Sequence, residues 1–316
     1  MEVIQDRPAP QAFYSVAGRL LFIETPDLQL HHQIELLFAG WQLRPVSFPD
    51  RSPDIRISFT CGKALPEVPR NLNQFDIAEG GRCYTEGPEL YLKLGDSLLH
   101  LTSGAPVTAE VWLAQLPGPG NPLPAKVASF AVCAALRRFG LFDVHSAGVV
   151  NPASGDAILI IGPSGSGKST LALQLVTAGW PYLSDDELLL SLDGDRVVAR
   201  GFRSFFAVSS AENSGLKNCF EPCGSRRQDQ ALPGLLLFTR LSGEEKTQLS
   251  KLTPAEAMTR LIRACPWATY DTAIAGANLA MLSALARQAN AFDLSAGRDL
   301  LAPGIAAELF GQDFRM

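Results

Sequence analysis

Apolar and polar positions follow two different patterns in the two halves of the chain. Residues 55–59 and 90–94 alternate apolar with polar side chains, which is typical of strands that bury one face. Residues 157–161 form a continuous apolar run and residues 235–239 nearly so, as expected for strands buried on both faces. The patterns therefore predict a small α+β domain, followed by an α/β domain built on a buried sheet.

Apolar residues with helical spacing lie between these strands. Residues 125–139 carry apolar side chains three and four positions apart, and Gly140 stands where a helix commonly stops. Thr253 is a predicted N-cap for residues 254–264, because its hydroxyl can accept a hydrogen bond from the first helical turn. The further predicted elements are a strand at 20–23 and helices at 29–39, 169–178 and 273–288.

A stretch dense in proline and glycine, residues 116–124, separates the two patterns. Such a stretch continues neither a helix nor a central strand, because proline has no N–H group to donate. We therefore predict an α+β domain over residues 1–117, a linker over 118–124 and a catalytic domain over 125–316. The first domain carries no chemical motif, and we interpret it as a module for a substrate or partner.

Composition and charge narrow the class of protein. Of 316 residues, 47% are hydrophobic and 19% charged, as in globular proteins, and the net charge of −5 argues against a nucleic-acid partner. Residues 1–10 are polar, so we expect no secretory signal. The apolar stretch 127–136 is shorter than the ~20 residues that span a bilayer. We therefore expect a cytoplasmic protein without membrane insertion.

The most specific motif is Gly162-x-x-x-x-Gly167-Lys168-Ser169, which matches the P-loop pattern in full. It follows a predicted buried strand and opens a predicted helix, which is the context that this pattern requires. The glycines let backbone N–H groups surround phosphate oxygens, Lys168 is expected to reach the β- and γ-phosphates, and Ser169 is expected to ligate Mg²⁺. The sequence thus predicts binding of ATP with Mg²⁺ by Gly162, Pro163, Ser164, Gly165, Ser166, Gly167, Lys168, Ser169 and Thr170.

Two consecutive acidic residues, Asp185 and Asp186, follow the next predicted strand, residues 180–184. In a βαβ unit this strand ends at the same edge of the sheet as the phosphate-binding loop. One carboxylate there can hold Mg²⁺, and another can accept the proton of an attacking hydroxyl. The alternative is a solvated acidic turn, and the residues leave open which aspartate has which role.

His145 lies on a strand predicted over residues 142–150, which a turn at 151–156 joins to the strand before the P-loop. A hairpin of these two strands would bring the imidazole near the γ-phosphate, where it could contact phosphate or orient the acceptor. A single histidine on a strand is also compatible with a purely structural role, and both interpretations stay open.

This ordered set of motifs resembles the catalytic domain of the HPr kinase/phosphorylase family. The resemblance covers residues 142–208: a strand with a histidine at 144–149, the P-loop, and the segment 179–186 that ends in the aspartate pair. It implies a P-loop kinase domain of the variant shared with phosphoenolpyruvate carboxykinases. The Gly-Trp-x-x-Leu-Ser-Asp pattern at 179–185 is similar to that of divergent HPr-kinase-like proteins.

The resemblance implies an ATP-dependent kinase that transfers the γ-phosphoryl group to a serine of a protein or peptide. It implies catalytic roles for Asp185, Asp186, His145 and Lys168, with Ser169 and Asp185 as Mg²⁺ ligands. Because the family forms oligomers, it also allows a homo-oligomer. Two alternatives stay open: a small-molecule kinase, and a nucleotide-binding regulatory ATPase or scaffold without transfer activity.

Overall fold

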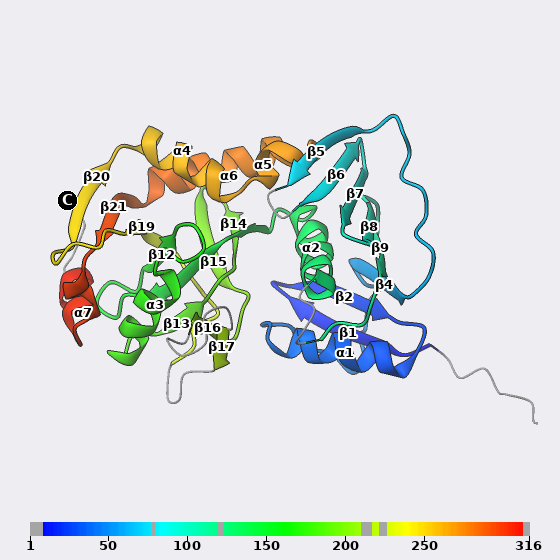
Figure 1. Ribbon diagram of the computed structural model, residues 1–316, viewed down its shortest axis with the longest axis horizontal. Helices are drawn as coiled ribbons and strands as arrows, with labels where there is room; N and C mark the ends of the chain where they lie inside the picture. The colour runs from blue at the N-terminus through cyan, green and yellow to red at the C-terminus, as the bar shows by residue number, and fades with distance from the viewer. Residues whose placement is uncertain (1–8, 78–79, 119–122, 210–216, 221–225, 312–316) are drawn as a thin grey trace, which may run out of the picture. The chain divides into compact units, whose positions relative to one another are not determined.

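In the computed structural model the chain forms two compact units (Figure 1). The first comprises Met1–Phe139 and Tyr270–Ala273, and the second Gly140–Thr269 and Ile274–Met316. The architecture is mixed α/β, with several sheets and few helices. None of the helices in the described part of the chain is long and apolar enough to cross a membrane. The described residues are 9–77, 80–118, 123–209, 217–220 and 226–311.

The first unit is built on one nine-stranded sheet in the order β3-β1-β2-β4-β9-β8-β7-β6-β5. Helix α1 buries Leu30, Ile34 and Phe38, which recur every four residues and therefore share one face. The predicted strands at 20–23, 55–59 and 90–94 and the predicted helix at 29–39 all appear here. The elements are β1 (Gln11–Val16), β2 (Arg19–Glu24), α1 (Leu28–Ala39), β3 (Arg44–Pro45), β4 (Ile55–Cys61), β5 (Asn73–Ile77), β6 (Gly81–Glu86), β7 (Glu89–Leu94), β8 (Ser97–Thr102), β9 (Val107–Leu113) and α2 (Leu123–Arg137).

The division between the units differs from the predicted domain boundary. Helix α2 packs against β8 and β9, so it belongs to the first unit, whereas the sequence placed it in the catalytic domain. The helix is buried over most of its surface, so its apolar pattern does not tell which sheet covers it. Of the predicted linker, residues 119–122 lie outside the described residues, and Leu123 and Pro124 already form the first turn of α2.

The second unit contains a six-stranded, a four-stranded and a two-stranded sheet, in the orders β13-β11-β12-β19-β21-β20, β10-β14-β15-β18 and β16-β17. Its strands are β10 (Phe142–Val144), β11 (Ser146–Val150), β12 (Ala157–Ile161), β13 (Tyr182–Ser184), β14 (Leu188–Asp193), β15 (Arg196–Gly201), β16 (Phe206–Ser209), β17 (Lys217–Phe220), β18 (Gln230–Ala231), β19 (Pro233–Leu241), β20 (Gln248–Leu252) and β21 (Asn290–Ala296). Its helices are α3 (Lys168–Thr177), α4 (Pro254–Ala264), α6 (Ala275–Gln288), the 3₁₀ turn η1 (Arg298–Leu301) and α7 (Ile305–Phe310), and the short α5 (Trp267–Tyr270) spans the division.

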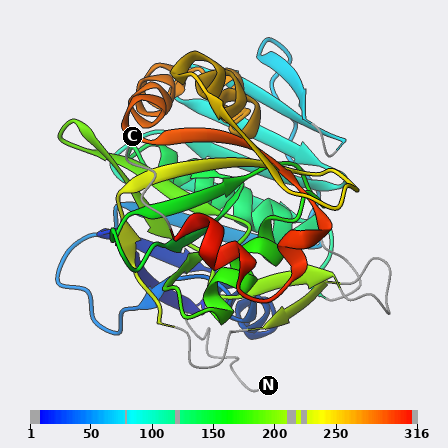
Figure 2. The same cartoon turned by 90° about the vertical axis from the view of Figure 1, so that its left-hand side faces the viewer.

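Helices cover both faces of the six-stranded sheet, which explains why its central strand β12 is apolar at every position. Along β12, Leu159 and Ile161 pack with α4 and α6, whereas Ile158 and Ile160 pack with α3 and α7. Successive side chains of a strand point to opposite faces, so a strand between two helical layers buries all of them. Figure 2 shows α3 and α7 side by side on their face of this sheet.

The predicted strand at 142–150 is two strands. Strand β10 pairs with β14 in the four-stranded sheet, and β11 pairs with β12 and β13 in the six-stranded sheet. The break falls at His145, which is exposed between two buried neighbours, Val144 and Ser146. The run reads as continuous in the sequence because both pieces are mostly apolar, and only the change of sheet separates them.

Candidate functional site

The glycine-rich loop, residues 162–167, joins the end of β12 to the start of α3. Gly165 and Gly167 have φ angles of 80° and 91°, in the left-handed region that glycine enters without a steric penalty. A Cβ on Gly162 would lie 2.6 Å from the backbone oxygen of Thr239 and 2.5 Å from Ser166 Oγ, so the loop closes tightly only with glycine there. Gly165 and Gly167 are thus required by their backbone angles, and Gly162 by the close approach of Thr239 and Ser166.

Helix α3 begins directly after this loop, at Lys168, and its N-cap residue Gly167 offers no side-chain acceptor. The first N–H groups of a helix have no partner within the helix, and they carry partial positive charge. With glycines before it and no capping side chain, this helix start leaves its N–H groups to an incoming anion.

The Lys168 side chain folds back over the loop and is buried, although lysine is charged. Its ammonium donates hydrogen bonds to the backbone oxygens of Gly162, at 2.8 Å, and Pro163, at 3.0 Å. It also lies 3.0 Å from Nε2 of His145. A buried cation needs such partners, and phosphate oxygens are stronger acceptors that can replace them.

His145 reaches Lys168 because β11 and β12 form the predicted antiparallel hairpin. Ser146 is level with Ile161 across this pair, so the residue before β11 lies beside the residue that opens the loop. The other ring nitrogen, Nδ1, is 3.5 Å from Asp186 Oδ1, and both side chains are 44% exposed. The histidine therefore lies between the loop lysine and an aspartate.

The aspartate pair follows β13, which pairs with β11 rather than with β12. Both neighbours of β11 are antiparallel to it, so β13 and β12 run in the same direction and end at the same edge, as predicted. Asp186 has a φ angle of 66°, which is uncommon for a residue with a side chain. Such a conformation is held by surrounding structure and often marks a functional position.

Ser184 holds the turn that carries the aspartates. Its hydroxyl donates to the backbone oxygen of Glu187 at 2.6 Å and accepts from the N–H groups of Phe202 and Arg203 at 3.1 and 2.8 Å. The Arg203 guanidinium pairs with the Glu187 carboxylate at 2.6 Å. These bonds order the turn, so the direction of the Asp186 side chain follows from the fold.

The two aspartates have different surroundings. Asp186 lines a cavity of about 440 Å³ that opens along the glycine-rich loop, whereas Asp185 is fully buried and does not line it. Of the other predicted site residues, Gly162 and Pro163 border a neighbouring cavity, and Ser166 is buried. The predicted residues that line the first cavity are His145, Ser164, Gly165, Gly167, Lys168, Ser169, Thr170 and Asp186.

The remaining wall of this cavity was not predicted. It comes from Leu171 and Gln174 of α3, the end of β19 with the turn after it, and the segment from the end of β21 into η1. Leu241, Leu300 and Leu301 are among its apolar members, and Arg298 is a charged one. The buried Thr239 hydroxyl donates to the Ser166 backbone oxygen at 3.2 Å and so ties β19 to the loop. The strand predicted at 235–239 is part of β19. No sequence motif marks the other residues of this wall.

The cavity is therefore lined by the glycine-rich loop and the start of α3 together with several apolar side chains. Its volume falls in the range of ~300–1,000 Å³ typical of small-molecule sites. Ser169 and Asp186 both line the cavity and offer oxygen atoms of the kind that Mg²⁺ prefers. The volume and the donor set suit a small ligand that carries an anionic group.

Comparison with known proteins adds little to this picture. No family model matches the chain, and no curated protein matches it. The solved structure of the HPr(Ser) kinase/phosphatase from Coxiella burnetii is similar over 35% of this chain and 71% of that chain, with 14% identity and a TM-score of 0.27. A TM-score this low carries no argument, so the P-loop kinase variant stays a prediction beside the observed mixed α/β architecture.

Proposed function

We propose that the second unit binds ATP with Mg²⁺ and transfers the γ-phosphoryl group to a serine hydroxyl of a protein or peptide. The observation that carries the proposal is the row of Lys168, His145 and Asp186 along one edge of the glycine-rich cavity. In this row the histidine links a lysine that can bind phosphate to a carboxylate that can accept a proton. Phosphoryl transfer requires both groups.

The loop N–H groups and Lys168 would hold the triphosphate, and the apolar side chains of Leu300 and Leu301, which line the same cavity, would pack against the base. The Ser169 hydroxyl lines the cavity and would hold an Mg²⁺ ion, which neutralises charge on the phosphate oxygens when it is bound. A role for Asp185 as metal ligand, expected from the resemblance, would need the turn to move, because this side chain is fully buried.

In the proposed reaction the acceptor oxygen attacks the γ-phosphorus and its proton passes to the Asp186 carboxylate. The bond from the γ-phosphorus to the β–γ bridging oxygen breaks, and ADP leaves with the electron pair. We assign the base to Asp186 rather than Asp185 because Asp186 lines the cavity. His145, which lines the same cavity, would contact the transferring phosphoryl group.

The test is incubation of the purified full chain with γ-labelled ATP, Mg²⁺ and serine peptides, following the label. Label on peptide serine supports the proposal, and its loss in Lys168→Ala, together with weaker ATP binding, locates the site. Lys251→Ala is a matched control, because Lys251 is an exposed lysine on β20 that does not line the cavity.

Two results would contradict the proposal. Release of the label only as inorganic phosphate would favour a regulatory ATPase. Unchanged ATP affinity in Lys168→Ala would show that the nucleotide does not bind at the loop, since the lysine supplies charge-assisted hydrogen bonds to phosphate.

A further inference from the structure

A second cavity, of about 420 Å³, borders the same loop. Gly162 and Pro163 form part of its wall, and it shares His145 and Thr239 with the first cavity. The two cavities therefore adjoin at the histidine that contacts Lys168. A molecule in the second cavity would reach this histidine from outside the proposed nucleotide site.

The second cavity has a basic wall arranged around one carboxylate. Strands β19 and β21 are parallel and in a register that puts Phe238 level with Asp293. Asp293 accepts a hydrogen bond from the Arg260 guanidinium and pairs with Arg240 at 3.1 Å. The Arg260 guanidinium also lies over the Phe238 ring, 5.6 Å from its centre. These contacts hold Arg260 in a defined position.

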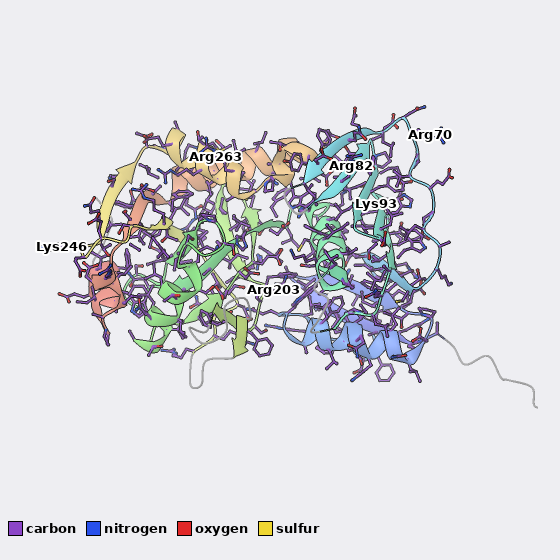
Figure 3. All side chains as sticks on the ribbon, in the orientation of Figure 1. Arg70, Arg82, Lys93, Arg203, Lys246 and Arg263 are labelled. Atoms are coloured by element: carbon purple, nitrogen blue, oxygen red, sulfur yellow. The ribbon has the colours of Figure 1, made fainter. Side chains whose placement is uncertain are left out.

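A third arginine, Arg263, which Figure 3 labels, follows Arg260 at the spacing of one helical turn on α4. It lines the same cavity. It is exposed, and it forms no ion pair with any residue that the structure describes. Three arginines thus line the cavity with one aspartate, in a chain whose net charge is −5. The local positive charge is therefore a property of this wall and not of the protein as a whole.

We propose that this arginine wall binds an acidic residue of the phosphoacceptor peptide, close in its sequence to the acceptor serine. The inference rests on the proposed function and names the substrate class of that site. A guanidinium presents paired N–H donors that match a carboxylate in a bidentate geometry. With Asp293 engaged by Arg240 and Arg260, the Arg263 guanidinium is the one that a peptide carboxylate would meet, and the serine would lie toward His145.

Binding of labelled peptides, measured by fluorescence polarisation on the full chain, tests this without requiring transfer. The probes are matched pairs of serine peptides that carry Asp or Glu beside the serine in one member and Asn or Gln in the other. We expect the acidic member to bind about tenfold more tightly, as one charge-assisted pair allows. Arg263→Gln should abolish the preference, and Arg263→Glu should reverse it in favour of peptides with Lys beside the serine.

Arg287→Gln is the control, because Arg287 is an exposed arginine on α6 that lines neither cavity. ATP affinity should be unchanged in every Arg263 variant, so a failure of the peptide preference is distinguishable from a failure of nucleotide binding. Equal binding of the paired peptides, or a preference that survives Arg263→Gln, would overturn the inference. So would Arg263-dependent transfer to a small hydroxy acid with no binding of the acidic peptides.

Discussion

Lys168 Nζ lies 3.0 Å from His145 Nε2. An ammonium group can only donate, so Nε2 is the acceptor, and we infer that the neutral imidazole carries its proton on Nδ1. That nitrogen faces the Asp186 carboxylate at 3.5 Å. The lysine thus selects the tautomer in which the histidine can donate a hydrogen bond toward the aspartate. Lys168, His145 and Asp186 are therefore linked by two consecutive polar contacts.

The first prediction concerns His145. His145→Ala should lower kcat for phosphoryl transfer by about 10²-fold, the effect of losing one positioned polar group at the reacting centre. The melting temperature should hardly change, because the side chain is 44% exposed. His32→Ala, at an exposed position on α1, is the control. Normal kinetics would return His145 to a structural role.

The second prediction separates charge from backbone geometry at Asp186. Asparagine tolerates the φ of 66°, so Asp186→Asn should fold and bind ATP, yet lose transfer by about 10²–10⁴-fold without its base. Asp186→Ala should in addition be less stable than Asp186→Asn by about 1 kcal/mol, because alanine enters this region at a steric cost. Kinetics and urea unfolding measure both. Full activity of Asp186→Asn would point to Asp185, to be tested in the same way.

The third prediction concerns the closed loop. Gly162→Ala places a Cβ against the Thr239 backbone oxygen, which cannot move without shifting β19, so we expect a loss of about 1–3 kcal/mol of unfolding free energy and weakened ATP binding. Gly276→Ala, in α6 with no atom within 4 Å of the added Cβ, should instead stabilise by about 0.5–1 kcal/mol. Equal effects of the two substitutions would refute the steric argument.

The fourth prediction concerns the first unit. Arg138 and Asp271 form a buried ion pair at 2.5 Å, and Arg138 also donates to Ser103 Oγ. Asp271→Asn should cost about 3–5 kcal/mol of unfolding free energy, because it leaves a buried guanidinium without its countercharge, while ATP affinity should hold. Asp76→Asn, which breaks an exposed pair with Arg82, should cost less than about 1 kcal/mol. Equal losses of unfolding free energy in the two variants would contradict the argument from burial.

Local signals in the sequence located the centre of the candidate site. The glycine-rich loop, its flanking strand and helix, and the hairpin before it all depend on contacts between residues close in the chain. Glycine spacing, a continuous apolar run and a turn suffice for such contacts. These same signals put His145 and Asp186 at one edge of the sheet, and both line the cavity there. Their roles in catalysis stay predictions.

What the sequence by itself determined is therefore the order and type of the central elements and the residues around the loop. Only the tertiary structure decided that residues 142–150 divide between two sheets, that α2 belongs to the first unit, and that Arg260 and Arg263 share a cavity with Asp293. These depend on pairings between distant strands and on which sheet covers a largely apolar helix. Hydrophobic periodicity records that a face is buried but not what buries it, so tertiary packing alone supplies that information.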